Sequence, residues 1–331
     1  MLIPNDRHNI GFTNRQVSTS ITQAANVPTL IENAGSETKR RFVEFFTANI
    51  SNLNTRSAYL RNVTRFCHWC EARELTLHQT EPTLVAFYIE ELGQKHSRPT
   101  VKQHLAAIRM LFDYFVTGGI LKANPASSVR GPKHVVVKGK TPVLQPADAR
   151  HLLDSIPTDT IGGLRDRALI SLMLYTFARV GAAVAVNIGD IQLNGRRYFV
   201  RLKEKGGRQH EMPLHHTAEE AILAYMDAGD LHGQKNMPLF RTLDRRRNLT
   251  ENRMLRQDAL SMVKRRARDS ELGTSVCNHS MRASGITAYM MNGGTLERAQ
   301  QMAAHASSRT TSLYNRANDS VTLDEVERIL I

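Results

Sequence analysis

The sequence predicts a mainly α-helical protein with two domains: an N-terminal four-helix domain and a C-terminal α+β domain, mostly helical with a small antiparallel β-sheet. Three observations indicate this. The chain has 331 residues, whereas single cores stop growing near about 250 residues. Four segments with apolar residues at helical spacing follow one another between residues 36 and 121. Further along, Asn194-Gly195 separates two short runs that favour strands, which is a strong hairpin signal.

The N-terminal region divides into a tail and a helical domain. Residues 1–35 are polar and lack periodic apolar positions, so we expect a flexible tail. The helical domain covers residues 36–121, with helices that start near Ser36, Thr55, Pro82 and Arg98. Gly118-Gly119 ends the last of them.

Residues 122–142 differ from both flanking regions. They combine Asn124-Pro125 and Gly131-Pro132 with several lysines and arginines. Proline, glycine and like charge together favour an extended, solvated segment. We therefore expect a basic interdomain linker that follows a phosphate backbone.

The C-terminal domain covers residues 143–331. Residues 146–155 and 163–177 favour helices, and the hairpin at Asn194-Gly195 is followed by a third short strand near His210–Leu214. Everything after His216 favours helices again. The last, residues 322–331, is short and amphipathic.

Charge and composition limit the possible partners. The chain has 44 Lys and Arg against 31 Asp and Glu, a net charge of +13, which favours a polyanion such as nucleic acid but does not separate DNA from RNA or an anionic membrane. Three cysteines are too few for a disulfide framework, and we expect Cys67 and Cys70 to be buried core residues. No apolar stretch approaches the roughly 20 residues that span a bilayer, and no signal peptide is visible. We expect a cytoplasmic protein without a membrane partner.

Six side chains in the C-terminal domain form a pattern with a chemical meaning: Arg179, Lys205, His279, Arg282, His305 and Tyr314. They are cations and neutral donors around one phenol, without a carboxylate cluster that would hold magnesium. A tyrosine can attack phosphorus directly when the charge on the phosphorane is stabilised, and arginines suit phosphate oxygens. We therefore expect phosphoryl transfer through Tyr314, with no metal and no cofactor.

The stretches Tyr175–Arg179, Glu204–Arg208, His279–Gly285 and Ala304–Tyr314 together resemble the tyrosine recombinase (phage integrase) family. The resemblance covers about residues 36 to 331 and implies a core-binding, SAM-like domain followed by a catalytic domain. It also implies the roles of the six residues: Arg179, Arg282 and His305 hold the phosphate, Lys205 protonates the leaving oxygen, His279 moves the tyrosine proton, and Tyr314 is the nucleophile.

The implied activity is site-specific recombination of double-stranded DNA through a 3′-phosphotyrosyl intermediate, without metal or ATP. The resemblance points to a simple integrase or Xer-like member without an arm-binding domain, associated with a prokaryotic nucleoid or a mobile element. It also implies a homotetramer on two duplexes, in which the helix at 322–331 docks in trans. We expect DNA contacts from basic residues of the helical domain and linker, namely Arg56, Arg61, Lys102, Arg130, Lys133, Lys138 and Lys140.

One position departs from the family pattern. Relatives often have an acidic residue three positions after the first arginine, where this chain has Ala182, and Asp190 is a possible substitute. Two other functions stay open at this stage. One is a type IB topoisomerase-like activity, which uses the same chemistry but religates the original strand. The other is a DNA-binding regulator on a recombinase scaffold.

Overall fold

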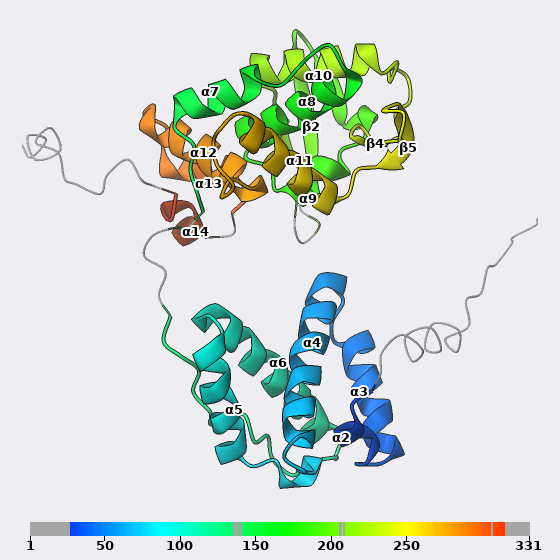
Figure 1. Ribbon diagram of the computed structural model, residues 1–331, viewed down its shortest axis with the longest axis vertical. Coiled ribbons are helices and arrows are strands. Elements are labelled where there is room, and N and C mark those ends of the chain that lie inside the picture. Colours follow the sequence, from blue (N-terminus) through cyan, green and yellow to red (C-terminus); the bar gives the residue numbers. More distant parts are fainter. Residues whose placement is uncertain are drawn as a thin grey trace, which may run out of the picture. The chain divides into compact units, whose positions relative to one another are not determined.

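Helices form most of the chain and divide into two units, Met1–Val135 and Val136–Ile331. The computed structural model describes residues 27–134, 139, 141–204, 207, 209–305 and 307–314 (Figure 1). The boundary between the units falls inside the segment that we predicted to be a linker. Each unit is described by itself.

The first unit is a helical bundle with an aromatic core. Phe66 lies at its centre, with its ring 5.9 Å from that of Phe112 and 5.1 Å from that of Tyr88. Helix starts follow capping chemistry: the Asn52 side chain accepts hydrogen bonds from two backbone amides at the start of α4. The four predicted helices are confirmed as α3 (Ser36–Ala48), α4 (Leu53–Glu71), α5 (Pro82–Lys95) and α6 (Arg98–Thr117), with a 3₁₀ turn at Leu77–Gln79.

The end of the expected tail differs from our prediction. Residues Thr29–Glu32 form a short helix, α2, in which Leu30 and Ile31 are buried in the core of the bundle. The backbone amide of Leu30 also donates to the Glu71 carboxylate at 2.7 Å. A helix of four residues shows no periodicity, so the sequence pattern could not reveal it. Residues 1–26 lie outside the described residues.

The beginning of the expected linker also differs from our prediction, because it packs on the first unit. The Arg109 guanidinium donates to the carbonyl oxygens of Ala126 and Val129. The Asn124 side chain donates in return to the Arg109 carbonyl at 3.0 Å. Both Ala126 and Val129 are buried in the bundle core. Proline and asparagine therefore produce turns here rather than an extended chain.

The second unit is built around α8 (Ile161–Thr176), a helix that is buried on nearly every side. It packs against α10 (His216–Ala228) and α12 (Asn278–Met291). The remaining helical elements are α7 (Pro146–Asp154), α9 (Val180–Ala185), a 3₁₀ turn at Ile188–Asp190, α11 (Arg256–Asp269), α13 (Leu296–Met302) and α14 (Ser308–Ser312).

A three-stranded antiparallel sheet in the order β1-β2-β3 lies in the same unit, with strands Ile191–Asn194, Arg197–Lys203 and Gln209–Pro213. Asn194 pairs with Arg197, and Lys203 pairs with Gln209. The predicted hairpin and third strand are therefore confirmed. The expectation of helices alone after His216 is wrong, because β4 (Arg241–Leu243) and β5 (Leu249–Arg253) form a second sheet. These strands are too short to show an alternating pattern.

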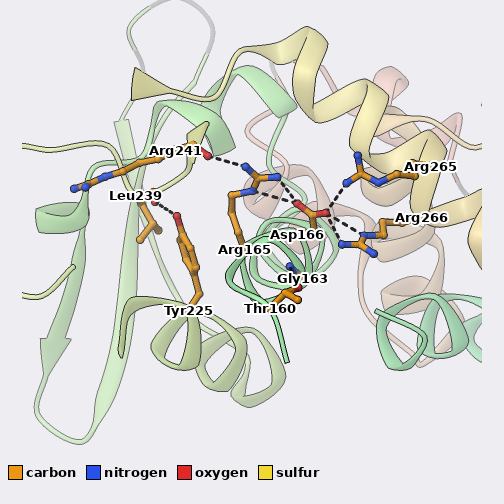
Figure 2. A network of polar contacts seen from close by, with 9 residues as sticks. All are labelled: Thr160, Gly163, Arg165, Asp166, Tyr225, Leu239, Arg241, Arg265 and Arg266. Atoms are coloured by element: carbon orange, nitrogen blue, oxygen red, sulfur yellow. Dashed lines mark hydrogen bonds and ion pairs between the residues drawn. The ribbon is translucent and has the colours of Figure 1, made fainter. Parts of the chain in front are cut away.

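A buried ionic network ties α8 to α11 and β4 (Figure 2). The Asp166 carboxylate is fully buried and accepts hydrogen bonds from Arg165, Arg265 and Arg266, each with a contact at 2.8 Å. Arg165 also donates to the carbonyl of Arg241 at 2.9 Å. One carboxylate thus joins segments about a hundred residues apart in sequence.

Cys67 and Cys70 lie in the core of the first unit, as predicted. Burial raises the pKa of the Cys67 thiol well above its ordinary value and that of Cys70 to about 12, so both are unreactive thiols. Of the helices that the structure describes, none is long and apolar enough to cross a membrane.

Candidate active site

Arg282 is the buried centre of the site. It lies on α12 and is 2% exposed, and its guanidinium donates to the carbonyl oxygens of Phe177 and Ala303. These carbonyls stand at the C-terminal ends of α8 and α13. Burial lowers the pKa of Arg282 to about 10, and the charge of Arg179 acts in the same direction. The guanidinium therefore stays charged at neutral pH in a partly desolvated place, where its charge acts strongly.

Close packing between α8 and α12 places Arg282 beside its partners. A Cβ atom on Gly285 would lie 2.1 Å from the carbonyl oxygen of Leu174, so only glycine fits this crossing. The backbone of Phe177 then turns into the left-handed region with φ of 55°, which aims its carbonyl at Arg282. The glycine in the His279–Gly285 motif thus has a packing role that supports the arginine.

Arg179 is held by a carboxylate that the sequence analysis did not assign. It caps α9, and its guanidinium donates to Glu204 with an N–O distance of 2.5 Å. The Glu204 side chain is 2% exposed and that of Arg179 is 33% exposed. Asp190, which we considered for this role, instead accepts from the backbone amide of Asn187 and closes a 3₁₀ turn. Glu204 is thus the carboxylate beside the first arginine.

His305 and Tyr314 come from a short segment around α14. The two rings are parallel, with centroids 5.9 Å apart. His305 Nδ1 lies 2.8 Å from the Thr311 hydroxyl, and the Tyr314 amide donates to the Thr311 carbonyl at 2.9 Å. Burial, together with the charges of Arg282 and Arg179, lowers the pKa of His305 to about 4. The imidazole is therefore neutral at pH 7.

His279 lies one turn before Arg282 on α12, and its side chain is accessible to solvent. Partial desolvation of the ring lowers the pKa of His279, and the charges of Arg282 and Arg179 lower it further. The Tyr314 hydroxyl interacts with Arg282, whose pKa it raises. Direct contacts and shared electrostatics thus bring together Arg179, His279, Arg282, His305 and Tyr314. Lys205 lies outside the described residues.

The basic residues expected to contact DNA divide into two kinds. In the described part of the first unit, exposed side chains are found at Arg61, Lys102, Arg130 and Lys133. Arg56 is partly buried, and its guanidinium donates to the carbonyl oxygens of Ile50 and Thr47, in and just after α3. Its position at the start of α4 lets the long side chain fold back on this loop. Lys138 and Lys140 lie outside the described residues.

Two positions in the site were missed by the sequence analysis. Glu204 is next to the predicted lysine, but its partner Arg179 is 25 residues earlier in the chain. Thr311 lies inside the motif that ends at Tyr314, and its hydroxyl is fully buried against His305. The only sequence signal for either residue is its place within a motif.

Comparisons with known proteins agree with this arrangement. The sequence profile of the Phage integrase family matches residues 142–320, and that of the Phage integrase N-terminal SAM-like domain matches residues 41–119. The chain is 28% identical over 274 residues to tyrosine recombinase XerC of Roseiflexus castenholzii, covering 80% of this chain and 83% of that protein. It is 27% identical over 264 residues to tyrosine recombinase XerD of Listeria monocytogenes, covering 79% and 87%.

Solved structures share the fold. The XerH site-specific recombinase bound to a palindromic difH substrate superimposes with a TM-score of 0.68 at 18% identity, over 91% of this chain and 90% of that one. A lambda integrase dimer bound to a core site gives a TM-score of 0.66 at 15% identity, over 95% of this chain and 85% of that one.

The profile matches show that the chain belongs to the phage integrase family. The prediction of a tyrosine recombinase, an enzyme that cleaves DNA and transfers strands site-specifically, is confirmed.

Proposed function

We propose that Tyr314 attacks the scissile phosphodiester of a recombination site and forms a 3′-phosphotyrosyl bond while the 5′-oxygen leaves. The observation that carries this assignment is the placement of the Tyr314 ring, which stacks on His305 with centroids 5.9 Å apart and lies near enough to Arg282 of the same chain to raise the pKa of that arginine. A phenol held beside a buried cation lies where a negatively charged phosphate would bind. The nucleophile and the phosphate clamp then come from one protomer.

Three side chains bind the phosphate in this proposal: the charged Arg179 and Arg282 and the neutral His305. Arg179 and Arg282 supply positive charge to the non-bridging oxygens, which gain charge in the phosphorane. His305 is neutral because of its lowered pKa, so it contributes a hydrogen bond rather than a charge. His305 Nδ1 lies 2.8 Å from the Thr311 hydroxyl, and in the tautomer in which that hydroxyl donates to Nδ1 the ring proton is on Nε2, where it can be donated to a phosphate oxygen.

Proton transfer would use the two remaining residues. His279 has a lowered pKa, so at neutral pH it is an unprotonated base that can accept the phenolic proton of Tyr314. Lys205, which follows Glu204 in the sequence, would give a proton to the departing 5′-oxygen. The 5′-hydroxyl of a second duplex then attacks the phosphotyrosine, which restores a phosphodiester and frees the tyrosine. One phosphoester bond forms for each that breaks, so the exchange needs no external energy source.

The assembly that we propose is a homotetramer on two duplexes, with the helix expected at 322–331 docking in trans. The last described residue, Tyr314, packs against a small hydrophobic cluster that includes Phe177 and that Tyr289 and Met302 also pack against. Phe177, Tyr289 and Met302 line a cavity of about 780 Å³ between α7, α8 and α12. The sequence at 322–331 is an apolar stripe on about ten residues, a length that is marginal as a helix without a docking partner. The groove of a neighbouring protomer would bury that stripe.

Deletion of residues 321–331 tests the assembly. We expect the truncated protein to bind one half-site as a folded monomer and to lose cooperative binding to a full site, together with recombination. Undiminished cooperative binding would show that the segment packs in cis or has no essential role. A binding titration that compares half-site and full-site DNA separates the outcomes.

We further propose a bacterial setting, with the enzyme acting on chromosomal or mobile-element DNA at the nucleoid, because the relatives named above are bacterial.

Covalent trapping on a library of nicked duplexes tests the proposed activity and identifies the target site in the same experiment. The wild-type chain should become linked to DNA through a 3′-phosphate, whereas Tyr314→Phe should bind without linkage. Linkage by Tyr314→Phe would remove Tyr314 from the role of nucleophile. A supercoiled substrate with two sites separates recombination from simple relaxation, and binding without trapping would favour a regulator.

A further inference from the structure

The Glu204 carboxylate occupies an unusual position for an acid in a phosphate-binding site. It follows β2 directly, its side chain is 2% exposed, and Oε2 lies 2.5 Å from a guanidinium nitrogen of Arg179. Oε1 lies 3.5 Å from the backbone amide nitrogen of the same residue. Glu204 is buried and contacts one nitrogen of the guanidinium, while the Arg179 side chain remains one-third exposed.

Burial of a carboxylate beside one arginine makes each depend on the other. Removing Arg179 would leave the buried Glu204 carboxylate without a counter-charge, which is costly, whereas removing Glu204 would leave the one-third exposed Arg179 guanidinium without its anchor. Arg179 also lies close enough to Arg282 to lower the pKa of the latter, whereas the charge of Glu204 raises it. The carboxylate therefore reduces the mutual repulsion of two cations that must both face one phosphate.

Helix α9 offers no acid for this purpose. Its residues are Val180-Gly181-Ala182-Ala183-Val184-Ala185, and Ala182 is buried where a carboxylate would have been one turn from Arg179. Asp190 is used within its own turn. In the described part of this unit, Glu204 is the acid in contact with Arg179.

We propose that Glu204 is a positioning residue for strand cleavage: it fixes Arg179 against the scissile phosphate and fastens the end of β2, immediately before Lys205, to the same point. The inference rests on the function proposed above. The proposal predicts different effects on DNA binding and on the cleavage rate. The negative charge of Glu204 near a phosphate opposes DNA binding, whereas the guanidinium that it fixes stabilises the transition state of cleavage. Glu204→Gln should therefore lower the cleavage rate of the bound complex without weakening DNA binding.

Single-turnover cleavage of a nicked suicide substrate by the full chain tests this. We expect Glu204→Gln to slow cleavage about 10- to 100-fold, as for a misplaced catalytic group, with a half-site Kd equal to or tighter than that of the wild type. In an Arg179→Ala background the same change should alter the rate less than about threefold, because the group that it positions is absent. Glu211→Gln, an exposed acid on β3, is the matched control and should leave cleavage unchanged.

A second variant guards against misfolding. Glu204→Asp keeps the charge on a shorter side chain, so it should recover part of the rate with a Tm near that of the wild type. Independent, multiplicative losses in the double variant, or equal losses of binding and cleavage, would overturn the proposal. If the wild type becomes covalently linked to DNA and Glu204→Gln cleaves at the wild-type rate, this inference alone is overturned. If the wild type does not become linked to DNA, the proposed function is refuted.

Discussion

His305 and Tyr314 stack with their ring planes 7° apart, and Thr311 contacts both residues from the short helix between them. The stack places a neutral imidazole against the phenol that we propose as the nucleophile. The Thr311 hydroxyl thus fixes the ring of His305, and the Thr311 carbonyl fixes the backbone of Tyr314.

Replacing that hydroxyl should impair chemistry more than binding. Thr311→Val keeps the shape of the side chain but leaves His305 Nδ1 without its partner, and we expect cleavage to slow about tenfold, equivalent to one lost buried hydrogen bond. Thr311→Ser should retain most of the rate. The exposed neighbour Thr310→Val is the control. Single-turnover cleavage measures all three, and an unaffected Thr311→Val protein would show that the ring needs no such support.

Acid should destabilise the second unit through His305. Its pKa is lowered from 6.5 to about 4 in the folded protein, so the unfolded chain takes up the proton first as the pH falls. The free energy of unfolding should therefore decline between about pH 6.5 and pH 4 and level off below. The decline attributable to this residue is at most ~3 kcal/mol.

Urea titrations of the wild type and His305→Gln at several pH values measure this contribution. The stability advantage of the wild type should shrink as the pH falls across that interval. His104, whose pKa is also lowered to about 4, is present in both proteins and cancels. A constant advantage would mean that His305 titrates normally.

Lys205 has a test that does not depend on its position. Lys205→Ala should cleave ordinary DNA slowly but recover on DNA whose scissile 5′-bridging oxygen is replaced by sulfur. A thiolate leaves without protonation, so the general acid is no longer needed. Equal impairment on both substrates would remove Lys205 from this role.

The ionic network around Asp166 should be required for folding rather than for catalysis. Asp166→Asn leaves Arg165 and Arg266 buried without a counter-charge, and we expect a loss of about 3–5 kcal/mol in the free energy of unfolding. Asp154→Asn is the matched control, since Asp154 is exposed and its nearest contact with Arg167 is 3.6 Å; it should change stability by less than ~1 kcal/mol. Similar losses in both variants would contradict the network's importance.

Salt dependence should report on the basic segment that follows the bundle. We expect replacement of Arg130, Lys133, Lys138 and Lys140 by glutamine to lower the slope of log Kd against log salt by about 0.9 for each phosphate contact that is lost. Arg73→Gln is the control, because Arg73 already pairs with Glu91 and stacks on Trp69. An unchanged slope in the fourfold variant would show that the segment does not follow the DNA backbone.

The sequence predicted what depends on local pattern and missed what depends on long-range pairing. The helical spacing of phenylalanines predicted the helices of the bundle, and Asn194-Gly195 predicted the hairpin between β1 and β2. The strands β4 and β5 were missed because, at three and five residues, they are too short to show an alternating pattern.

The candidate site shows the same division. Motif spacing named five side chains that the described structure brings together, but it could not name Glu204, which contacts Arg179 across the fold. It also gave no sign that the Arg56 guanidinium donates to the carbonyl oxygens of Ile50 and Thr47. Whether an arginine faces solvent or a nearby carbonyl is decided by the loop beside it, and no spacing rule describes that loop.

The hydrogen bonds of Arg282 have a consequence for the order in which the site can form. Its guanidinium is oriented by carbonyls at the ends of α8 and α13, which are more than a hundred residues apart in sequence. A chain that is still being synthesised, or one whose last helices have come loose, lacks one of these acceptors and cannot hold the arginine in place. Completion of the fold is then a precondition for holding Arg282 in the candidate site, since its two acceptors meet only when α8, α12 and α13 have packed together.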